Sequence, residues 1–254
     1  MKKLFIAIMS VAVLFTSCKE GGSSKKQTNT AESSTTATSV EEAEKTVEAI
    51  CLLDKLSVRE TPKAKGKWIT SISLGETVVY TGDEVTDDTS KKEYCKVKLT
   101  DGKEGWTRKS FLAVNGKVGV MLGDASVYKR PDLLTKTEKK YSVMDIIAVT
   151  AIQGDWMQVK GKRSEGEYIE EGWIKSSNFS ADPVDIATAK FASTAMSKST
   201  MTERIKALQE VITNPDLSSS KFVEVIKNKI ADYESKNKAV DVEDVKVDEN
   251  SEMK

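Results

Sequence analysis

Histidine is absent from all 254 residues of the chain. Without an imidazole, the chain lacks a Ser-His-Asp triad, a Cys-His pair and any histidine-containing zinc site. The 39 acidic residues leave hydrolysis by a pair of carboxylates open. We therefore expect a protein that is not an enzyme, with no metal site and no cofactor.

An excess of positive charge is also missing, because 39 lysine and arginine residues balance 39 aspartate and glutamate residues. Proteins that bind DNA or RNA usually present a strongly basic face to the phosphates. The composition therefore predicts no nucleic-acid partner.

The apolar run near the N-terminus is short, since Leu4 to Phe15 spans about 12 residues where a membrane-crossing helix needs about 20. Met1-Lys2-Lys3 precedes it, and the small residues Thr16 and Ser17 follow it, directly before Cys18. A charged start, an apolar centre and a small-residue end are typical of a signal peptide, here residues 1–17.

Phe15-Thr16-Ser17-Cys18 resembles the lipobox of bacterial lipoproteins, with phenylalanine where leucine is usual. The resemblance implies that Cys18 becomes the acylated N-terminus, carrying palmitate or similar chains, and that membrane lipid is one partner. Several acyl chains anchor stably, whereas one binds only marginally. Lys19 in place of aspartate resembles the pattern sent to the outer membrane, on its periplasmic side or at the cell surface. The alternative is an ordinary secreted protein with an unrelated cysteine.

The segment after Cys18 is poor in apolar residues. From Lys19 to Ser39, 12 of 21 residues are glycine, serine or threonine. Such a segment buries too little surface to offset its ordering entropy, so we predict a disordered tether over residues 18–44 with a reach of roughly 25 Å.

An internal repeat is the most informative feature of the sequence. Segments of the first copy recur in the same order in the second at offsets of 69, 69, 62 and 67: 57–62 with 126–131, 77–81 with 146–150, 93–98 with 155–160, and 104–110 with 171–177. The changing offset indicates loops of different length. We place the two copies at residues 45–114 and 115–180.

Each copy consists of short runs rich in valine, isoleucine, tyrosine and tryptophan, separated by turn residues, which predicts strands. Between Tyr94 and Leu99, Cys95 and Val97 share one face with Leu99 while the lysines take the other. Closing such strands into a small barrel removes exposed sheet edges.

The first copy resembles the bacterial SH3-like domain, through four segments: Leu56–Pro62, Gly75–Val78, Tyr94–Val97 and Gly105–Trp106. The second copy departs from that pattern, with Lys129 and Arg130 before its proline and no glycine in Tyr141-Ser142-Val143. Its assignment depends on the internal repeat. The resemblance implies tandem SH3-like barrels that bind cell-wall peptides or glycans.

After residue 180 the apolar period changes from two to three and four, which predicts about three helices over residues 181–237. Asp182-Pro183 opens the first, through about Lys198, and Thr200 with Glu203 forms a capping box for the second, which Asn214-Pro215 ends. The third is predicted at 219–235, with its apolar stripe at Phe222, Ile226, Ile230 and Tyr233. The helices must pack on each other or on the second barrel, and we predict a disordered acidic tail at 238–254.

Cys51 and Cys95 lie in the first copy, at positions that the repeat matches to Val120 and Met157 in the second. An exported protein meets an oxidising compartment, so we predict a disulfide between them, closing about 43 residues and contributing about 4 kcal/mol. The alternative is a pair of buried thiols that behave as small hydrophobes.

Four aromatic residues are candidate ligand contacts: Tyr94, Trp156, Trp68 and Tyr128. Tyr94 and Trp156 face away from the Val97 and Val159 side of their strands and are the preferred pair. Trp106 and Trp173 each follow glycine at the same place in both copies, which favours a packing role for them. Packing within the barrels is the competing role for all of these rings.

The sequence thus predicts a mainly β protein, with two tandem SH3-like barrels followed by about three helices. We expect a membrane-anchored lipoprotein of the cell envelope that binds peptidoglycan or an envelope protein without catalysis. The alternatives are a surface-displayed lipoprotein that binds host or other external proteins, and a structural adaptor in an envelope complex.

Overall fold

The structure is a computed structural model that describes the backbone of residues 47–248 and the side chains of residues 47–236. These residues lie in one compact unit that contains both sequence copies and the helical segment. The predicted signal peptide, Cys18, the tether and the last residues of the acidic tail lie outside the described residues.

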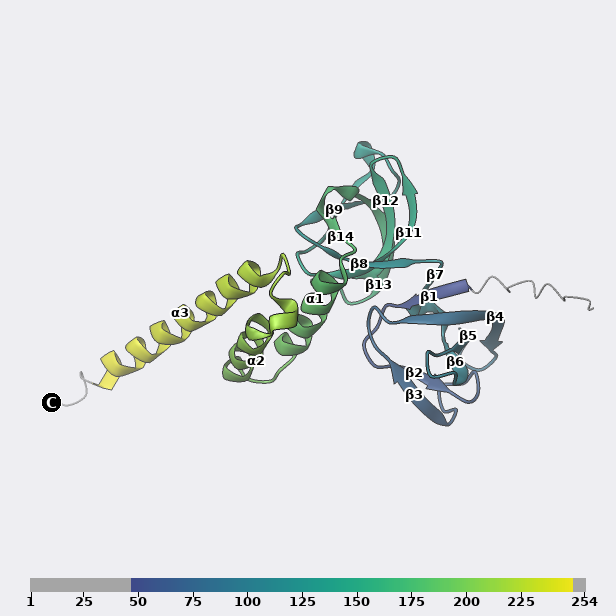
Figure 1. Cartoon of the computed structure of the whole chain (residues 1–254), viewed down its shortest axis with the longest axis horizontal. Helices are drawn as coiled ribbons and strands as arrows, with labels where there is room; N and C mark the ends of the chain where they lie inside the picture. Colours follow the sequence, from purple (N-terminus) through teal and green to yellow (C-terminus); the bar gives the residue numbers. More distant parts are fainter. Residues whose placement is uncertain (1–46, 249–254) are drawn as a thin grey trace, which may run out of the picture. The chain divides into compact units, whose positions relative to one another are not determined.

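The first copy folds into a seven-stranded antiparallel sheet, coloured blue to teal in Figure 1. Its strands are β1 (Val47–Cys51), β2 (Leu56–Arg59), β3 (Trp68–Ile72), β4 (Thr77–Asp87), β5 (Lys92–Lys98), β6 (Glu104–Arg108) and β7 (Leu112–Val114). They lie in the order β3-β2-β6-β5-β4-β1-β7, and a 3-10 turn, Lys109–Phe111, joins the last two in sequence. We call this unit barrel 1.

The second copy, barrel 2, has the same strand order strand for strand, β10-β9-β13-β12-β11-β8-β14. Its strands are β8 (Lys117–Met121), β9 (Ala125–Tyr128), β10 (Lys136–Tyr141), β11 (Ile146–Gln153), β12 (Trp156–Lys162), β13 (Ile169–Lys175) and β14 (Phe179–Ser180). Short 3-10 turns, Leu133–Thr135 and Ser176–Asn178, lie in its loops. The predicted fold class, mainly β with a helical C-terminal segment, is confirmed.

Gly75 of barrel 1, which has no glycine counterpart in barrel 2, lies in a tight turn before β4. In barrel 1 the Ser73 amide donates to the Glu76 carboxylate at 2.8 Å, and Gly75 between them has a φ of 74°. In barrel 2 the Ser142 amide donates to Asp145 at 2.8 Å, and Met144 adopts a φ of 69°. A left-handed conformation costs little for glycine and more for methionine, so the same turn is built in barrel 2 with local strain.

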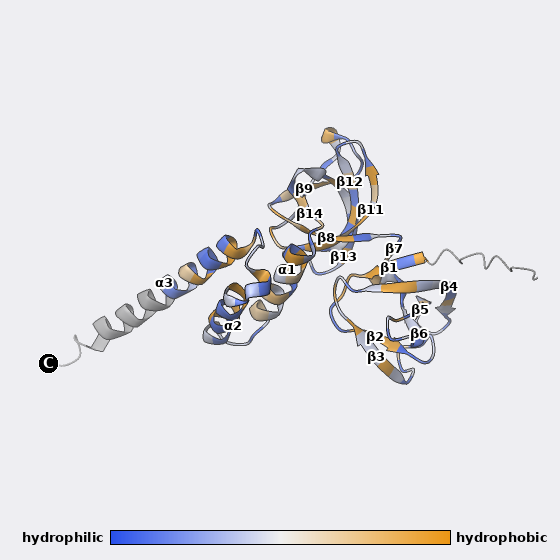
Figure 2. Ribbon diagram, in the orientation of Figure 1, coloured by the Kyte–Doolittle hydropathy of each residue, from blue (hydrophilic) through white to orange (hydrophobic). Residues whose placement is uncertain are grey.

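Each sheet curls around its own apolar core, and apolar and polar residues alternate along the strands in Figure 2. Cys95, Val97 and Leu99 are all buried, as their spacing predicts. Lys96 and Lys98, which alternate with them along the strand, remain accessible to solvent. The period-two pattern therefore fixes which face of each strand closes the barrel.

Three helices follow the barrels: α1 (Pro183–Met196), α2 (Met201–Thr213) and α3 (Val223–Asp248), with a 3-10 turn at Pro215–Leu217. The predicted caps are confirmed, since the Asp182 side chain accepts from the Val184 amide and Thr200 forms a reciprocal capping box with Glu203. The apolar stripe of α3 packs against α2, and Leu208 and Ile226 belong to one core with Val120 and Ile146 of barrel 2. Among the described residues, no helix is long and apolar enough to cross a membrane.

The third helix differs from its prediction at both ends. It begins at Val223 and not at Ser219, and it continues through Asp248, into the segment predicted to be disordered. Once packing of Phe222 and Ile226 has formed the first turns, each added residue costs less than helix nucleation did. No proline or glycine interrupts residues 223–248.

Asp185, in the first turn of α1, holds the helices to barrel 2. Its carboxylate is 1% exposed and accepts from the hydroxyls of Ser180 and Ser220 at 2.6 and 3.0 Å and from the Lys221 amide at 2.9 Å. The Lys221 ammonium adds a contact at 3.2 Å. Burial acts to raise the pKa of Asp185, but these hydrogen bonds outweigh it and hold the pKa below its usual range.

We predict that Asp185→Ala lowers the free energy of unfolding by about 3 kcal/mol, because it leaves two buried hydroxyls and one amide without their acceptor. Urea titration of the full chain measures this. Asp182→Ala is the matched control, since it removes one exposed cap bond and should cost about 1 kcal/mol. A folded-state pKa below 3.8 means that the Asp185 contribution is present above that pH and is lost as the pH falls further. Equal losses for the two variants at neutral pH would contradict this role.

Candidate functional site

The inner face of each barrel contains a glycine at a point where two strands nearly touch. A Cβ built on Gly105 of β6 would lie 2.6 Å from the Val58 side chain, and one on Gly172 of β13 would lie 2.5 Å from Val127. Real Cβ atoms do not approach so closely, so these positions require glycine. Because side chains alternate along a strand, the next residues, Trp106 and Trp173, point to the outer face.

In barrel 1 the outward tryptophan belongs to a row of directly paired residues that crosses four strands. Trp68 of β3 is opposite Arg59 of β2, Arg59 is opposite Trp106 of β6, and Trp106 is opposite Lys96 of β5. Directly paired residues project from the same face of a sheet, so the four side chains are neighbours. We call them row 1. Trp68 is 57% exposed, and the other three are partly exposed.

Barrel 2 has the corresponding row at the same register, row 2. Lys136 of β10 is opposite Tyr128 of β9, Tyr128 is opposite Trp173 of β13, and Trp173 is opposite Gln158 of β12. Trp156 extends this row, since its ring meets that of Tyr128 edge to face with centroids 4.9 Å apart. The Lys175 ammonium lies 4.1 Å from the Trp156 ring centroid. Both rows therefore combine partly exposed aromatic rings with cationic side chains.

Ion pairs and hydrogen bonds hold the row side chains in place. In row 1 the Lys96 ammonium pairs with Glu104 at 2.7 Å, and the Arg59 guanidinium donates to the Gly66 carbonyl at 2.7 Å. In row 2 the Gln158 amide donates to Glu171 at the position that corresponds to Glu104. Such surface pairs add little stability, but they orient the side chains beside the rings.

Three of the four predicted contact residues lie in or beside these rows. Trp68 is in row 1, Tyr128 is in row 2, and Trp156 packs against Tyr128. Whether they touch a ligand stays a prediction.

The prediction of an exposed Tyr94 is wrong, since this residue is 2% exposed. The β4–β5 hairpin extends beyond Tyr94, with Val85 opposite it on one side and Arg108 on the other. In barrel 2 the equivalent hairpin ends at the pair Gln153 and Trp156, which leaves Trp156 at its margin. Hairpin length therefore decides that Trp156 and not Tyr94 meets solvent.

Sequence reasoning missed Trp106, Trp173 and Arg59 as members of an outer surface. The signal was present in the strand Gly105-Trp106-Thr107, because a glycine and a buried threonine on one face place the tryptophan on the other. The pairing of Arg59 with two tryptophans depends on strand neighbours that are distant in sequence, and no local pattern reveals it.

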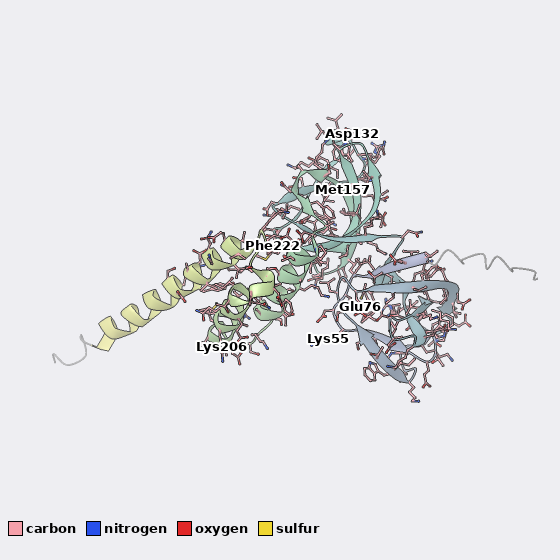
Figure 3. The ribbon with its side chains drawn as sticks, in the orientation of Figure 1. Lys55, Glu76, Asp132, Met157, Lys206 and Phe222 are labelled. Carbon is pink, nitrogen blue, oxygen red and sulfur yellow. The ribbon has the colours of Figure 1, made fainter. Side chains whose placement is uncertain are left out.

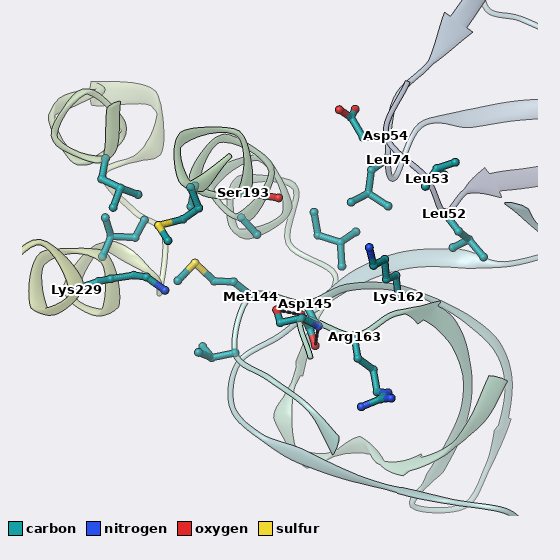
Figure 4. Close-up of a pocket in the computed structure, with 18 residues that line it drawn as sticks. Leu52, Leu53, Asp54, Leu74, Met144, Asp145, Lys162, Arg163, Ser193 and Lys229 are labelled. Atoms are coloured by element: carbon teal, nitrogen blue, oxygen red, sulfur yellow. Dashed lines mark hydrogen bonds between the residues drawn. The ribbon is translucent and has the colours of Figure 1, made fainter. Parts of the chain in front are cut away.

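A cavity of about 550 Å³ lies elsewhere, lined by the Leu52–Asp54 loop, the Val143–Ile146 turn and residues of the three helices (Figure 4). Most of its lining side chains are apolar. The Asp145 carboxylate in its wall already accepts from the Ser164 amide and hydroxyl and from the Ser142 amide, which gives it a structural role. Among the residues that the structure describes, no cluster of three or more cysteine, aspartate or glutamate side chains could hold a metal ion.

Cys51 and Cys95 are buried in the core of barrel 1 as free thiols. The Cys51 thiol contacts the Leu53 carbonyl at 3.0 Å. Burial raises the pKa of both thiols to about 11. The structure thus differs from the predicted disulfide and agrees with the alternative of two buried thiols.

The repeat alignment at Cys51 is corrected by one residue. The Cys51 amide donates to the Glu76 carbonyl, and Met121 does the same to Asp145, so Cys51 corresponds to Met121 and not to Val120. Cys95 corresponds to Met157, as expected, because each lies one residue before the partner of the row tryptophan. Two methionines in barrel 2 thus take the places of two cysteines in barrel 1.

Residues 54–113 match the family of bacterial SH3 domains. Barrel 1 therefore contains a bacterial SH3 domain. No curated protein matches the chain significantly. Two solved structures from Trichomonas vaginalis, those of NlpC2 and NlpC1, align with 60% of this chain and with 56% and 53% of theirs, at 12% identity and TM-scores of 0.23 and 0.22. The chain spans about half the length of these proteins, and likeness at this level carries no argument about activity.

We predict that neither thiol reacts with a soluble thiol reagent in the native protein, because both are buried and protonated at neutral pH. The full chain carrying Cys18→Ser should show two reactive thiols after unfolding without reductant. Unfolding in which no thiol reacts would establish the disulfide instead. The raised pKa values also predict that stability falls as the pH rises from about 9 toward 11, where the unfolded thiols ionise and the folded ones do not.

Proposed function

We propose that this chain is a non-catalytic lipoprotein of the bacterial cell envelope that holds peptidoglycan through rows 1 and 2. Bacterial SH3 domains commonly bind peptidoglycan, and barrel 1 contains such a domain. The identical strand order of barrel 2 supports its assignment to the same family.

The observation that carries the proposal is the pair of aromatic rows at the same register on both sheets. Tryptophan and tyrosine supply large contact area with few rotatable bonds, so they lose little entropy on binding. The cations beside them, Arg59 in row 1, Lys136 in row 2 and Lys175 beside Trp156, suit the carboxylates of peptidoglycan stem peptides. Each row thus offers a flat apolar strip for a sugar or peptide backbone with positive charge beside it.

The absence of histidine supports a role without catalysis. Acylation of Cys18, export and attachment to the outer membrane remain part of the proposal. They rest on the lipobox resemblance and on Lys19, which lie outside the described residues. An anchor on the membrane with two wall-binding barrels would tie the two layers of the envelope together.

Two barrels on one chain would bind in a linked manner. When one row holds a peptidoglycan strand, the second meets the polymer at high effective concentration, and overall affinity can rise by about 10² to 10⁴. Loss of one row should therefore weaken binding strongly, and loss of both should abolish it.

The test is co-sedimentation of the full chain, in detergent, with purified peptidoglycan. We predict that Trp68→Ala, or Tyr128→Ala with Trp156→Ala, weakens binding at least about tenfold, and that the triple variant does not pellet. Phe191→Ala on α1 and Tyr168→Ala in a barrel 2 loop are matched controls, because both remove exposed rings, 53% and 73% exposed, outside the rows. Thermal melts confirm that each variant folds.

Binding that survives in the triple variant would exclude the rows as the site. A native chain that never pellets with peptidoglycan would overturn the proposed ligand and direct the search to protein partners.

A further inference from the structure

One exposed turn of barrel 2 has no part in rows 1 and 2. It connects β9 to β10 and carries two adjacent leucines, Leu133 and Leu134, that are 64% and 94% exposed. Figure 3 labels Asp132 in this turn, at the outer tip of barrel 2. Neither leucine belongs to an apolar core. Two large apolar side chains side by side in water indicate a surface that is covered by something else.

The turn is held in shape by hydrogen bonds of its own. The Asp132 carboxylate accepts from the Leu134 amide at 2.9 Å, and the Thr135 hydroxyl donates to the Asp132 carbonyl at 2.8 Å. The Lys129 amide donates to the Thr135 carbonyl at 3.1 Å. The leucines are thus presented on an ordered turn, and burying them would cost little backbone entropy.

Basic side chains lie just before the leucines. Lys129 and Arg130 are exposed, and neither forms an ion pair among the described residues. The acidic residue that follows them, Asp132, uses its carboxylate to cap the turn. The tip therefore combines a protruding apolar pair with positive charge.

The equivalent loop of barrel 1 shows that the fold does not require the leucines. Two and three residues after the shared proline it has Ala64 and Lys65. Its Lys67, which corresponds to Thr135, pairs with Glu60 at 2.7 Å. The two loops share basic residues and the proline that follows β2 and β9. The loops also differ by one residue in length, but barrel 1 closes this connection without any exposed leucine, and the pair in barrel 2 packs into no core. We infer that the leucine pair serves something outside the barrel.

We propose that this turn inserts Leu133 and Leu134 into the surface of an anionic lipid bilayer while Lys129 and Arg130 contact the lipid phosphates. A convex, apolar tip with cations suits a deformable anionic surface, whereas a protein partner would need a matching concave pocket. The inference rests on the proposed function in one respect, because the acylated Cys18 would keep barrel 2 near the membrane. The anchor and the tip would then supply the two signals that stable attachment needs.

The test places a polarity-sensitive dye on the full, acylated chain at Leu134→Cys or, as a control in the equivalent loop of barrel 1, at Ala64→Cys. Cys51 and Cys95 are buried and should not label in the folded protein. The chain is reconstituted into vesicles of mixed phosphatidylglycerol and phosphatidylcholine. We expect a blue shift and quenching by lipid-borne quenchers at position 134 and neither at position 64. Leu133→Ser should lower the inserted fraction about tenfold, and salt should weaken insertion.

Equal emission at positions 134 and 64 on anionic vesicles would overturn the proposal and leave the leucines to a protein partner. An equal shift at 134 on pure phosphatidylcholine vesicles would overturn the role of the cations. If Cys18 is not acylated, two separate measurements detect it. The free Cys18 thiol takes up a second dye, and the chain no longer pellets with vesicles. In that event the dye at position 134 of the Cys18→Ser chain still reports on the tip by itself.

Discussion

The missing side chains of Gly105 and Gly172 let one strand of each barrel approach its neighbour until a valine side chain fills the space. This approach closes the core at Val58 and Val127. It also fixes which residues of the glycine-containing strands face the core and which face solvent. With the inward position taken by glycine, the following tryptophan must project outward beside Arg59 or Tyr128. Core closure and the outer aromatic rows therefore follow from one steric constraint, which explains why a glycine–tryptophan pair stands at the same place in both copies.

The two cores contain different residues at equivalent positions, but the summed volume of two residues that face each other stays similar. Leu56 and Ile72 face each other in barrel 1, and the equivalent pair in barrel 2 is Ala125 and Tyr141, so a smaller residue compensates a larger one. Ala49 and Leu112 of barrel 1 likewise correspond to Gly119 and Phe179 of barrel 2. The larger Phe179 ring leaves no room for a side chain at Gly119, where a Cβ would lie 2.0 Å from it. Close-packed interiors tolerate changes of this paired kind and resist single ones. The outer faces carry no such coupling, which leaves them free to differ.

Local patterns in the sequence were sufficient for the elements whose determinants are local. The caps at Asp182 and Thr200, the alternation around Val97 and the order of repeated segments all predicted what the structure shows. The errors lie where distant contacts decide. Tyr94 is covered by the longer β4–β5 hairpin, and helix α3 continues because packing of its first turns supports the rest. The rows depend on residues up to 47 positions apart that pair across neighbouring strands, such as Arg59 and Trp106. The internal repeat shows which strands occur in both copies, but it does not show which strands lie next to each other in the sheet.

The placement of the helices bears on whether row 2 is open to a ligand. Helix α1 contacts β8 and β11, and the shared core contains Val120 and Ile146 from those strands. In the strand order of barrel 2, row 2 crosses β10, β9, β13 and β12, on the other part of the sheet. Asp185 fixes this arrangement, because its hydrogen bonds tie α1 to Ser180 of β14 and to Ser220 and Lys221, which directly precede α3. The helices thus cover one side of barrel 2 without occupying row 2, and barrel 2 can present the same kind of surface as barrel 1 while also carrying the helical segment.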